Sequence, residues 1–201
     1  NNYREIVTTL KDQGHLAGLR HIVRVDPGSV NFPGSVSWSH MRELGLQLDH
    51  AQLRGLQAGI TPYDVAYILY TSGSTSTPKG VQLQHYGLIE NMWHIGERQH
   101  LRPGDRLWLA VSLFWGLGCG NALFAMMTHA ATIVLQRQFE PAEALSLIER
   151  EQCSVIYAMP NMVHSITSDP SFTAARLASL RTGITIGTPE QIKLLAGLGV
   201  T

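Results

Sequence analysis

The side chains best suited to chemistry in this chain are concentrated in one stretch, which reads Tyr-Thr-Ser-Gly-Ser-Thr-Ser-Thr-Pro-Lys-Gly from Tyr70 to Gly80. Glycine lets backbone N–H groups approach phosphate oxygens closely. Ser and Thr hydroxyls bind phosphate oxygens or magnesium-bound water. Lys79 adds a compact positive charge on a flexible stem. Together these types predict a loop that binds a triphosphate through Thr71, Ser72, Gly73, Ser74, Thr75, Ser76, Thr77, Pro78, Lys79 and Gly80.

The order of residues in this stretch differs from two common nucleotide-binding motifs. A P-loop reads Gly-x-x-x-x-Gly-Lys-Ser/Thr, whereas here Pro78 stands five positions after Gly73 and Lys79 precedes Gly80. No Gly-x-Gly-x-x-Gly fingerprint follows any candidate strand. Composition alone leaves a flexible linker or a surface hairpin as the alternative.

Strands and helices are expected to alternate around this loop. We expect strands at 65–70, 81–83, 106–111, 131–135, 153–158 and 180–186. We expect helices at 85–99, 117–128, 141–151, 161–168 and 190–197. Helices between strands imply right-handed crossovers, so the predicted fold class is α/β, with a mostly parallel sheet and helices on both faces. The continuous apolar run 65–70 predicts a strand buried on both faces.

The first 60 residues carry no recognisable chemistry. Their patterns predict a helix over 1–19, a strand at 21–25 and one or two helices over 41–56. We therefore expect residues 1–60 to form an edge portion with a loop, and residues 61–201 to form the main α/β subdomain.

Composition limits the function classes. Basic and acidic residues number 15 each among 201 residues, so no net field is available to hold nucleic acid or an anionic membrane. The nine histidines lack zinc-ligand spacing, and Cys119 and Cys153 are expected to be buried thiols. No leader and no membrane-spanning run is visible, which predicts a cytoplasmic setting.

The loop also closely resembles a known family. Tyr70 to Val81 is similar to the loop of the AMP-forming adenylate-forming superfamily (acyl-CoA synthetases, luciferases and peptide-synthetase adenylation domains), usually Tyr-Thr-Ser-Gly-Ser/Thr-Thr-Gly-x-Pro-Lys-Gly-Val. Only Ser76 departs, where the family usually has glycine. The resemblance implies that residues 61–201 are the AMP-binding part of a large N-terminal domain, with the C-terminal domain absent.

Two later segments extend the resemblance. Ser112 to Gly118 resembles the acyl-pocket motif, with Trp115 where the family usually has histidine, which implies an acyl pocket at Phe114, Trp115, Gly116 and Gly118. Ile184 to Pro189 resembles the turn that lies against adenine, which implies adenine contacts from Gly187, Thr188 and Pro189. A core tryptophan and an ordinary strand-to-helix turn are the alternatives.

The resemblance implies an acyl-CoA-ligase-like reaction with ATP, in which Thr71 helps place Mg²⁺. A carboxylic acid becomes an acyl-adenylate, and CoA or a phosphopantetheine thiol, with a carrier protein as a further partner, takes the acyl group. Family members that activate amino acids usually place an aspartate beside the aromatic of the acyl motif. Here Trp115 follows Phe114, and a buried ammonium without a counter-charge is costly, so a fatty or aryl acid is favoured.

Later family motifs, namely Tyr-Gly-x-Thr-Glu, Thr-Gly-Asp and a C-terminal lysine, do not occur before Thr201. We therefore expect an internal fragment that binds nucleotide weakly, contains no assignable catalytic residue and does not turn over. Two alternatives stay open for the parent protein: a non-catalytic nucleotide-binding or protein-association module, and an amino-acid-activating adenylation domain.

Overall fold

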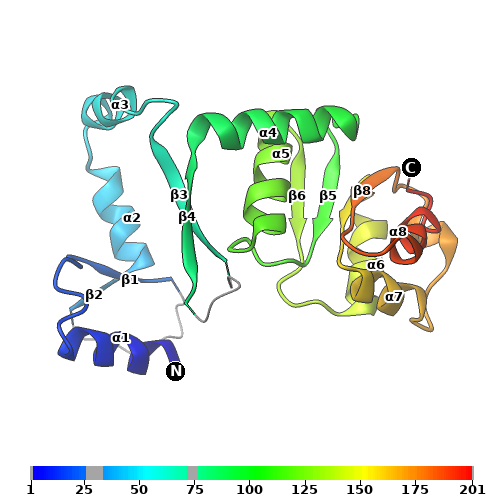
Figure 1. Ribbon diagram of the computed structural model, residues 1–201, viewed down its shortest axis with the longest axis horizontal. Coiled ribbons are helices and arrows are strands. Elements are labelled where there is room, and N and C mark those ends of the chain that lie inside the picture. Colours follow the sequence, from blue (N-terminus) through cyan, green and yellow to red (C-terminus); the bar gives the residue numbers. More distant parts are fainter. Residues whose placement is uncertain (1, 26–33, 72–76, 201) are drawn as a thin grey trace. The chain divides into compact units, whose positions relative to one another are not determined.

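A computed structural model describes residues 2–25, 34–71 and 77–200 of the chain (Figure 1). The chain divides into two compact units, residues 1–60 and 61–201.

The first unit contains a helix, a short parallel strand pair and two further helices. These are α1 (Asn2–Asp12), β1 (Ile22–Arg24), β2 (Ser35–Ser37), α2 (Trp38–Leu46) and α3 (His50–Ala58). The side chains of Ser37 and Asp49 cap the N-termini of α2 and α3 by accepting backbone N–H bonds. No residue of α2 or α3 is buried. The predicted strand is found, and the predicted helices are found with other bounds: the first ends at Asp12 rather than at residue 19, and the second begins at Trp38.

The second unit holds the main sheet. Its strands are β3 (Val65–Thr71), β4 (Lys79–Gln84), β5 (Arg106–Leu109), β6 (Thr132–Leu135), β7 (Val155–Tyr157) and β8 (Thr182–Ile184). Its α-helices are α4 (His85–Arg98), α5 (Phe124–Thr128), α6 (Pro141–Arg150), α7 (Pro160–Thr167) and α8 (Pro189–Ala196). A π-helix, η1 (Gly116–Leu123), precedes α5, and a 3-10 turn, η2 (Ala174–Leu177), precedes β8.

Four of these strands form one parallel sheet in the order β6-β5-β7-β8. Because the strands are parallel, their carboxyl ends share one edge, where ligands bind in open α/β sheets. The predicted fold class, an α/β sheet that is mostly parallel, is confirmed.

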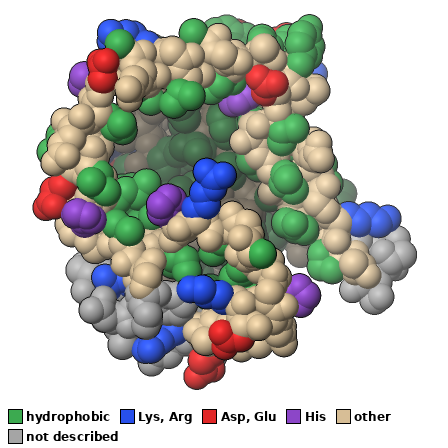
Figure 2. Space-filling model, turned by 90° about the vertical axis from the view of Figure 1, so that its left-hand side faces the viewer, with side chains coloured by type: hydrophobic (Ala, Val, Ile, Leu, Met, Phe, Trp, Pro, Cys, Tyr) green, Lys and Arg blue, Asp and Glu red, His purple; other side chains and the backbone are tan. Residues whose placement is uncertain are grey.

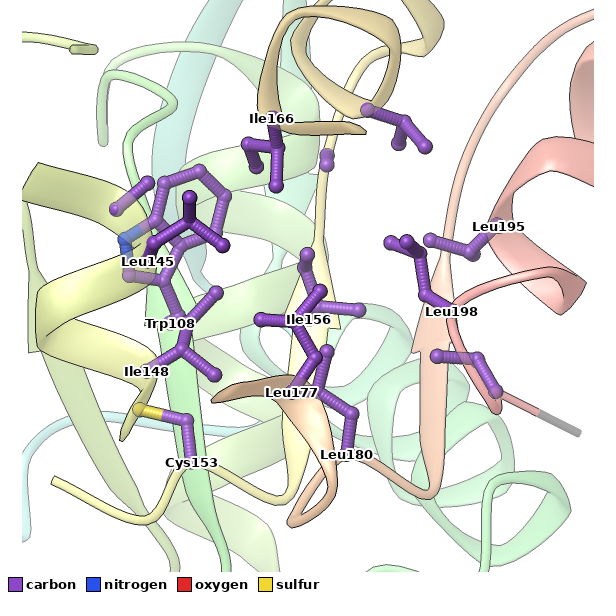
Figure 3. Packing of buried hydrophobic residues seen from close by; sticks show 14 residues of the cluster. Trp108, Leu145, Ile148, Cys153, Ile156, Ile166, Leu177, Leu180, Leu195 and Leu198 are labelled. Atoms are coloured by element: carbon purple, nitrogen blue, oxygen red, sulfur yellow. The ribbon is translucent and has the colours of Figure 1, made fainter. Parts of the chain in front are cut away.

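The sheet buries both of its faces. Successive residues of β5 and β7 alternate between two apolar clusters, which is the period-2 pattern of a strand. Trp108 and Ile156 pack with α6, α7 and α8 (Figure 3). Leu107 and Tyr157 pack on the opposite face with α4, η1 and α5. Helices on both faces, as predicted, therefore cover the sheet.

The strand before the loop differs from the prediction. β3 pairs only with β4 in a two-stranded antiparallel sheet, and Ile68 and Tyr70 are 50% and 71% exposed, so the prediction of a strand buried on both faces is wrong. Only residues 72–78 join β3 to β4, whereas a parallel crossover needs about a dozen residues. The apolar run reflects a strand that packs on one face through alternate residues.

The predicted helix over 117–128 begins as a π-helix. A Cβ on Gly118 would overlap the carbonyl oxygen of Ser112, so the backbone passes very close to the chain that precedes it. Within this π-helix Cys119 is only half-buried, which corrects the expectation of a buried thiol. Cys153 is buried as expected, and burial raises its pKa to about 11.

The surface carries mixed side chains. On the face drawn in Figure 2, hydrophobic, basic and acidic side chains are interspersed, in keeping with the balanced composition. Among the described residues, no helix combines the length and the apolar character that a bilayer crossing requires.

Candidate functional site

The predicted phosphate loop is bounded by a hairpin. Thr71 ends β3 and Lys79 begins β4, and the two residues are direct partners in the antiparallel register. Directly paired residues project from the same face with Cβ atoms about 5 Å apart. Thr71, Lys79 and Gly80 are therefore strand residues, whereas the prediction placed them in a loop. Ser72, Gly73, Ser74, Thr75 and Ser76 lie outside the described residues.

Beyond this pair, the hairpin shows why Gly80 is a glycine. A Cβ there would lie 3.0 Å from the Ile68 side chain and 3.6 Å from the Tyr70 ring. Lys79 is exposed, so its ammonium group is available to a ligand. The hairpin thus places one hydroxyl and one positive charge side by side at the mouth of the loop.

The predicted acyl-pocket residues follow the carboxyl end of β5. Phe114 and Trp115 are 72% and 56% exposed and meet edge to face with ring centroids 6.0 Å apart. The alternative of a core tryptophan is therefore excluded for Trp115 in this chain. Trp115 caps η1, and Gly116 and Gly118 lie in its first turn. Gly118 is buried, and the close approach of Ser112 makes it irreplaceable by a larger residue without a backbone shift.

The predicted adenine turn follows the carboxyl end of β8. Thr188 caps α8, since its hydroxyl accepts from the Gln191 N–H while the Gln191 side chain accepts from the Thr188 N–H. Pro189 occupies the first turn of α8. Gly187 is exposed, and a Cβ there would collide with Gln191 and approach Pro160. A hydrogen bond from its own N–H, and then one from Thr188, lower the pKa of Glu190.

The sheet therefore brings two predicted segments to one edge. β7 lies between β5 and β8, so their carboxyl ends are about 10 Å apart, twice the usual strand spacing. Pro160, which follows β7, contacts the adenine turn from between them. Sequence reasoning missed this contribution of β7. The proline immediately after a buried strand was the available signal, because it marks the first turn of a helix at that edge.

The opposite edge of the sheet is closed by an ion pair. Buried Asp105 pairs with Arg181 and accepts hydrogen bonds from the Arg102 N–H at 2.9 Å and the Ser154 hydroxyl at 2.7 Å. Arg106 beside it pairs with Glu151. These charges are engaged with one another, so they stabilise the amino edge and leave the carboxyl edge as the place for a ligand.

A further contact joins the hairpin to α5, and sequence reasoning missed it. Tyr67 of β3 stacks on Phe124 with ring centroids 6.3 Å apart. Its hydroxyl is buried beside the Cys119 thiol, which is a weak hydrogen-bond partner. Burial, and then the neighbouring Cys119 thiol, raise the pKa of this phenol. Nothing in an apolar run before a loop distinguishes Tyr67 from an ordinary strand residue.

Thr71 is the residue that the predicted magnesium site depends on. Within the ranges that the structure describes, no group of three His, Cys, Asp or Glu side chains could hold a metal ion. Mg²⁺ often takes one protein oxygen and completes its shell with phosphate and water. The Thr71 hydroxyl, beside Lys79 at the mouth of the loop, fits that pattern.

The chain is similar to known proteins along most of its length. The family model described as AMP-binding enzyme matches residues 6–198. Acyl-CoA ligase sidI of Aspergillus fumigatus is 31% identical over 189 residues, which are 94% of this chain and 32% of that protein. The chain spans about a third of the length of the curated relatives it matches.

Solved structures share the fold. The N-terminal domain of FACL13 from Mycobacterium tuberculosis aligns with a TM-score of 0.70 at 21% identity, covering 98% of this chain and 51% of that one. MatB from Rhodopseudomonas palustris, solved with ATP bound, aligns with a TM-score of 0.61 at 24% identity, covering 68% of this chain and 27% of that one.

Proposed function

We propose, from the premise that this chain belongs to the AMP-binding enzyme family, that the complete protein containing it uses ATP to activate a carboxylic acid. A carboxylate oxygen attacks the α-phosphorus, the bond to pyrophosphate breaks, and an acyl-adenylate forms. A thiolate then attacks the acyl carbon and AMP leaves. The observation that carries the proposal is the loop from Tyr70 to Val81, whose ends the hairpin holds with Thr71 opposite Lys79.

The loop would bind the phosphates that depart as pyrophosphate. Lys79 is exposed and carries a charge that offsets the negative charge developing on the leaving oxygens. Thr71, with the hydroxyls and N–H groups of residues 72–77, would hold the β- and γ-phosphates. Mg²⁺ bound at Thr71 would neutralise part of the phosphate charge.

Segments at the carboxyl ends of the parallel strands would bind the adenine of ATP and the carboxylic acid. Gly187, Thr188 and Pro189 would line the adenine pocket, where the absence of a Cβ at Gly187 lets the capping side chain of Gln191 lie close against the turn. Phe114, Trp115, Gly116 and Gly118 would shape the acyl site. The two exposed rings offer apolar surface to an acyl chain or an aryl ring.

The choice of substrate class depends on whether the acyl segment has an acidic side chain to pair with a substrate ammonium group. Ser112 to Gly118 contains no acidic side chain that could meet an ammonium group. We therefore assign a fatty or aryl acid rather than an amino acid, with CoA as the thiol acceptor. The name of the relative sidI, an acyl-CoA ligase, supports this choice of acceptor.

The experiment is ATP–pyrophosphate exchange by the complete protein with fatty, aryl and amino acids, each at matched concentration. Exchange with fatty or aryl acids, followed by CoA-dependent release of AMP, is the expected result. If only amino acids support exchange, the substrate is an amino acid rather than a fatty or aryl acid. Nucleotide binding without exchange for any acid would favour a non-catalytic module, for which the departures at Ser76 and Trp115 leave room.

A further inference from the structure

Three residues of β3 share one face and lead to the phosphate loop. The register from Tyr67 to Thr71 is regular, so Tyr67, Leu69 and Thr71 project to one side, and Ile68 and Tyr70 project to the other. Thr71 and its partner Lys79 therefore lie on the same side of the hairpin as Tyr67 and Leu69.

That side of the hairpin rests on the π-helix η1. The position of a Cβ on Gly116 lies 3.6 Å from Leu69 Cδ2, and that on Gly120 lies 3.4 Å from the Tyr67 hydroxyl oxygen. Leu69 and Tyr67 thus sit over two glycines spaced four residues apart. A Cβ at either position would make an ordinary van der Waals contact, so both glycines lie within contact distance of the strand.

The contact connects the two halves of the proposed site, which are the phosphate loop and the acyl segment from Ser112 to Gly118. The acyl segment ends at the first turn of η1, where Gly116 lies under Leu69. Thr71 lies two residues beyond Leu69, about 7 Å further along the strand. The position of β3 along η1 therefore sets how far Thr71 and Lys79 lie from Phe114 and Trp115.

We propose that Leu69 and Tyr67 are positioning residues, which hold the phosphate loop at a fixed distance from the acyl segment by resting on Gly116 and Gly120. This inference rests on the proposed function, because the distance matters only if a carboxylate and an α-phosphate react between the two segments. A displacement of about 1 Å between reacting groups lowers rates about 100-fold without abolishing binding. The effect of these residues is thus expected in kcat rather than in KM.

The test compares two neighbouring residues of one strand in the complete protein. Leu69→Ala removes the contact with η1, and Ile68→Ala removes an aliphatic side chain of the same size from the other, half-exposed face. We expect Leu69→Ala to lower kcat for adenylate formation about 10-fold, with KM for ATP and acid within about 3-fold of wild type. Ile68→Ala should retain kcat, and Leu69→Met, which keeps the length of the side chain, should restore it.

The outcomes separate this inference from the proposed function. If wild-type protein forms no adenylate with any acid, the proposed function fails and the inference fails with it. If wild-type protein is active and Leu69→Ala keeps its kcat, changes only KM, or loses no more than Ile68→Ala, the positioning role alone is overturned. Should Leu69→Ala not fold, as judged by thermal unfolding, Leu69→Val replaces it, with an expected loss in kcat of about 3-fold.

Discussion

The parallel sheet and the β3–β4 hairpin use apolar residues in opposite ways. In the sheet, β5 and β7 bury residues on both faces, and Trp108, Ile156 and Tyr157 have no exposed surface. In the hairpin, Ile68 and Tyr70 are 50% and 71% exposed. Their neighbours Tyr67 and Leu69 meet η1, and Ala66 packs against the same apolar cluster as Tyr67. Both regions are rich in apolar residues, so composition does not separate them.

This difference indicates that the parallel sheet provides stability and that the β3–β4 hairpin contacts the ligand. A strand packed on both faces cannot move without loss of contacts on each side, which suits a scaffold. A hairpin packed on one face can present the paired residues Thr71 and Lys79 to a ligand. Four predictions test this division, in order of decreasing expected effect.

The largest effect is expected in the scaffold. Trp108→Ala should lower the free energy of unfolding by about 4 kcal/mol, because it leaves a cavity between the sheet and α6. Ile68→Ala, in the hairpin, should cost less than about 1 kcal/mol, since half of that side chain is already in solvent. Urea unfolding of both variants measures the difference. Equal losses would mean that the hairpin belongs to the scaffold.

The second effect concerns the proposed chemistry. Lys79→Met should lower adenylate formation about 100-fold, because one preorganised charge at the departing phosphates is lost. Its thermal stability should stay unchanged, since the side chain is exposed. Lys11→Met in the first unit removes the same charge from an exposed helix position and serves as the control. Equal activity of the two variants contradicts the role of Lys79.

The third effect is a pH dependence of the scaffold. Burial raises the pKa of Tyr157 to about 12, above its usual value near 10, although a hydrogen bond from Gln99 partly opposes the shift. The folded protein therefore keeps this proton up to a higher pH than the unfolded chain does. Stability should be unaffected below about pH 10 and should fall by roughly 2 to 3 kcal/mol as the pH rises towards 12.

Because other tyrosines and lysines titrate over the same range, the informative quantity is a difference. Urea unfolding of wild type and Tyr157→Phe at pH 8, 10 and 11 should show a smaller alkaline loss in the variant. A variant that loses as much stability as wild type would show that Tyr157 ionises as easily in the folded protein as in the unfolded chain.

The smallest effect lies where the two regions meet. Tyr67→Phe removes a buried hydroxyl whose neighbour, the Cys119 thiol, is a weak hydrogen-bond partner, so it should raise the free energy of unfolding by about 1 kcal/mol. The ring and its contact with Phe124 remain and only the contact of the hydroxyl oxygen with Gly120 is lost, so any fall in kcat should be smaller than that of Leu69→Ala. Destabilisation of the variant by differential scanning calorimetry would show instead that the hydroxyl has a stronger partner than this thiol.

The sequence by itself determined the order of strands and helices in the second unit, because burial imposes a period of two on strands and about four on helices. In the first unit the short strand β2 was not predicted. It also singled out the stretch from Thr71 to Gly80 by its residue types, although Thr71, Lys79 and Gly80 are strand residues in the structure. The carboxyl-edge positions of the acyl and adenine segments follow from those elements once the sheet is known to be parallel.

Only the tertiary structure decided which apolar residues are covered and which segments meet. The run from Val65 to Tyr70 looks like a core strand in sequence, yet its two faces differ because η1 packs on one of them. The contacts of Tyr67 with Gly120 and of Leu69 with Gly116 join residues about 50 positions apart. Such contacts depend on how elements pack against one another, a property that no local pattern encodes.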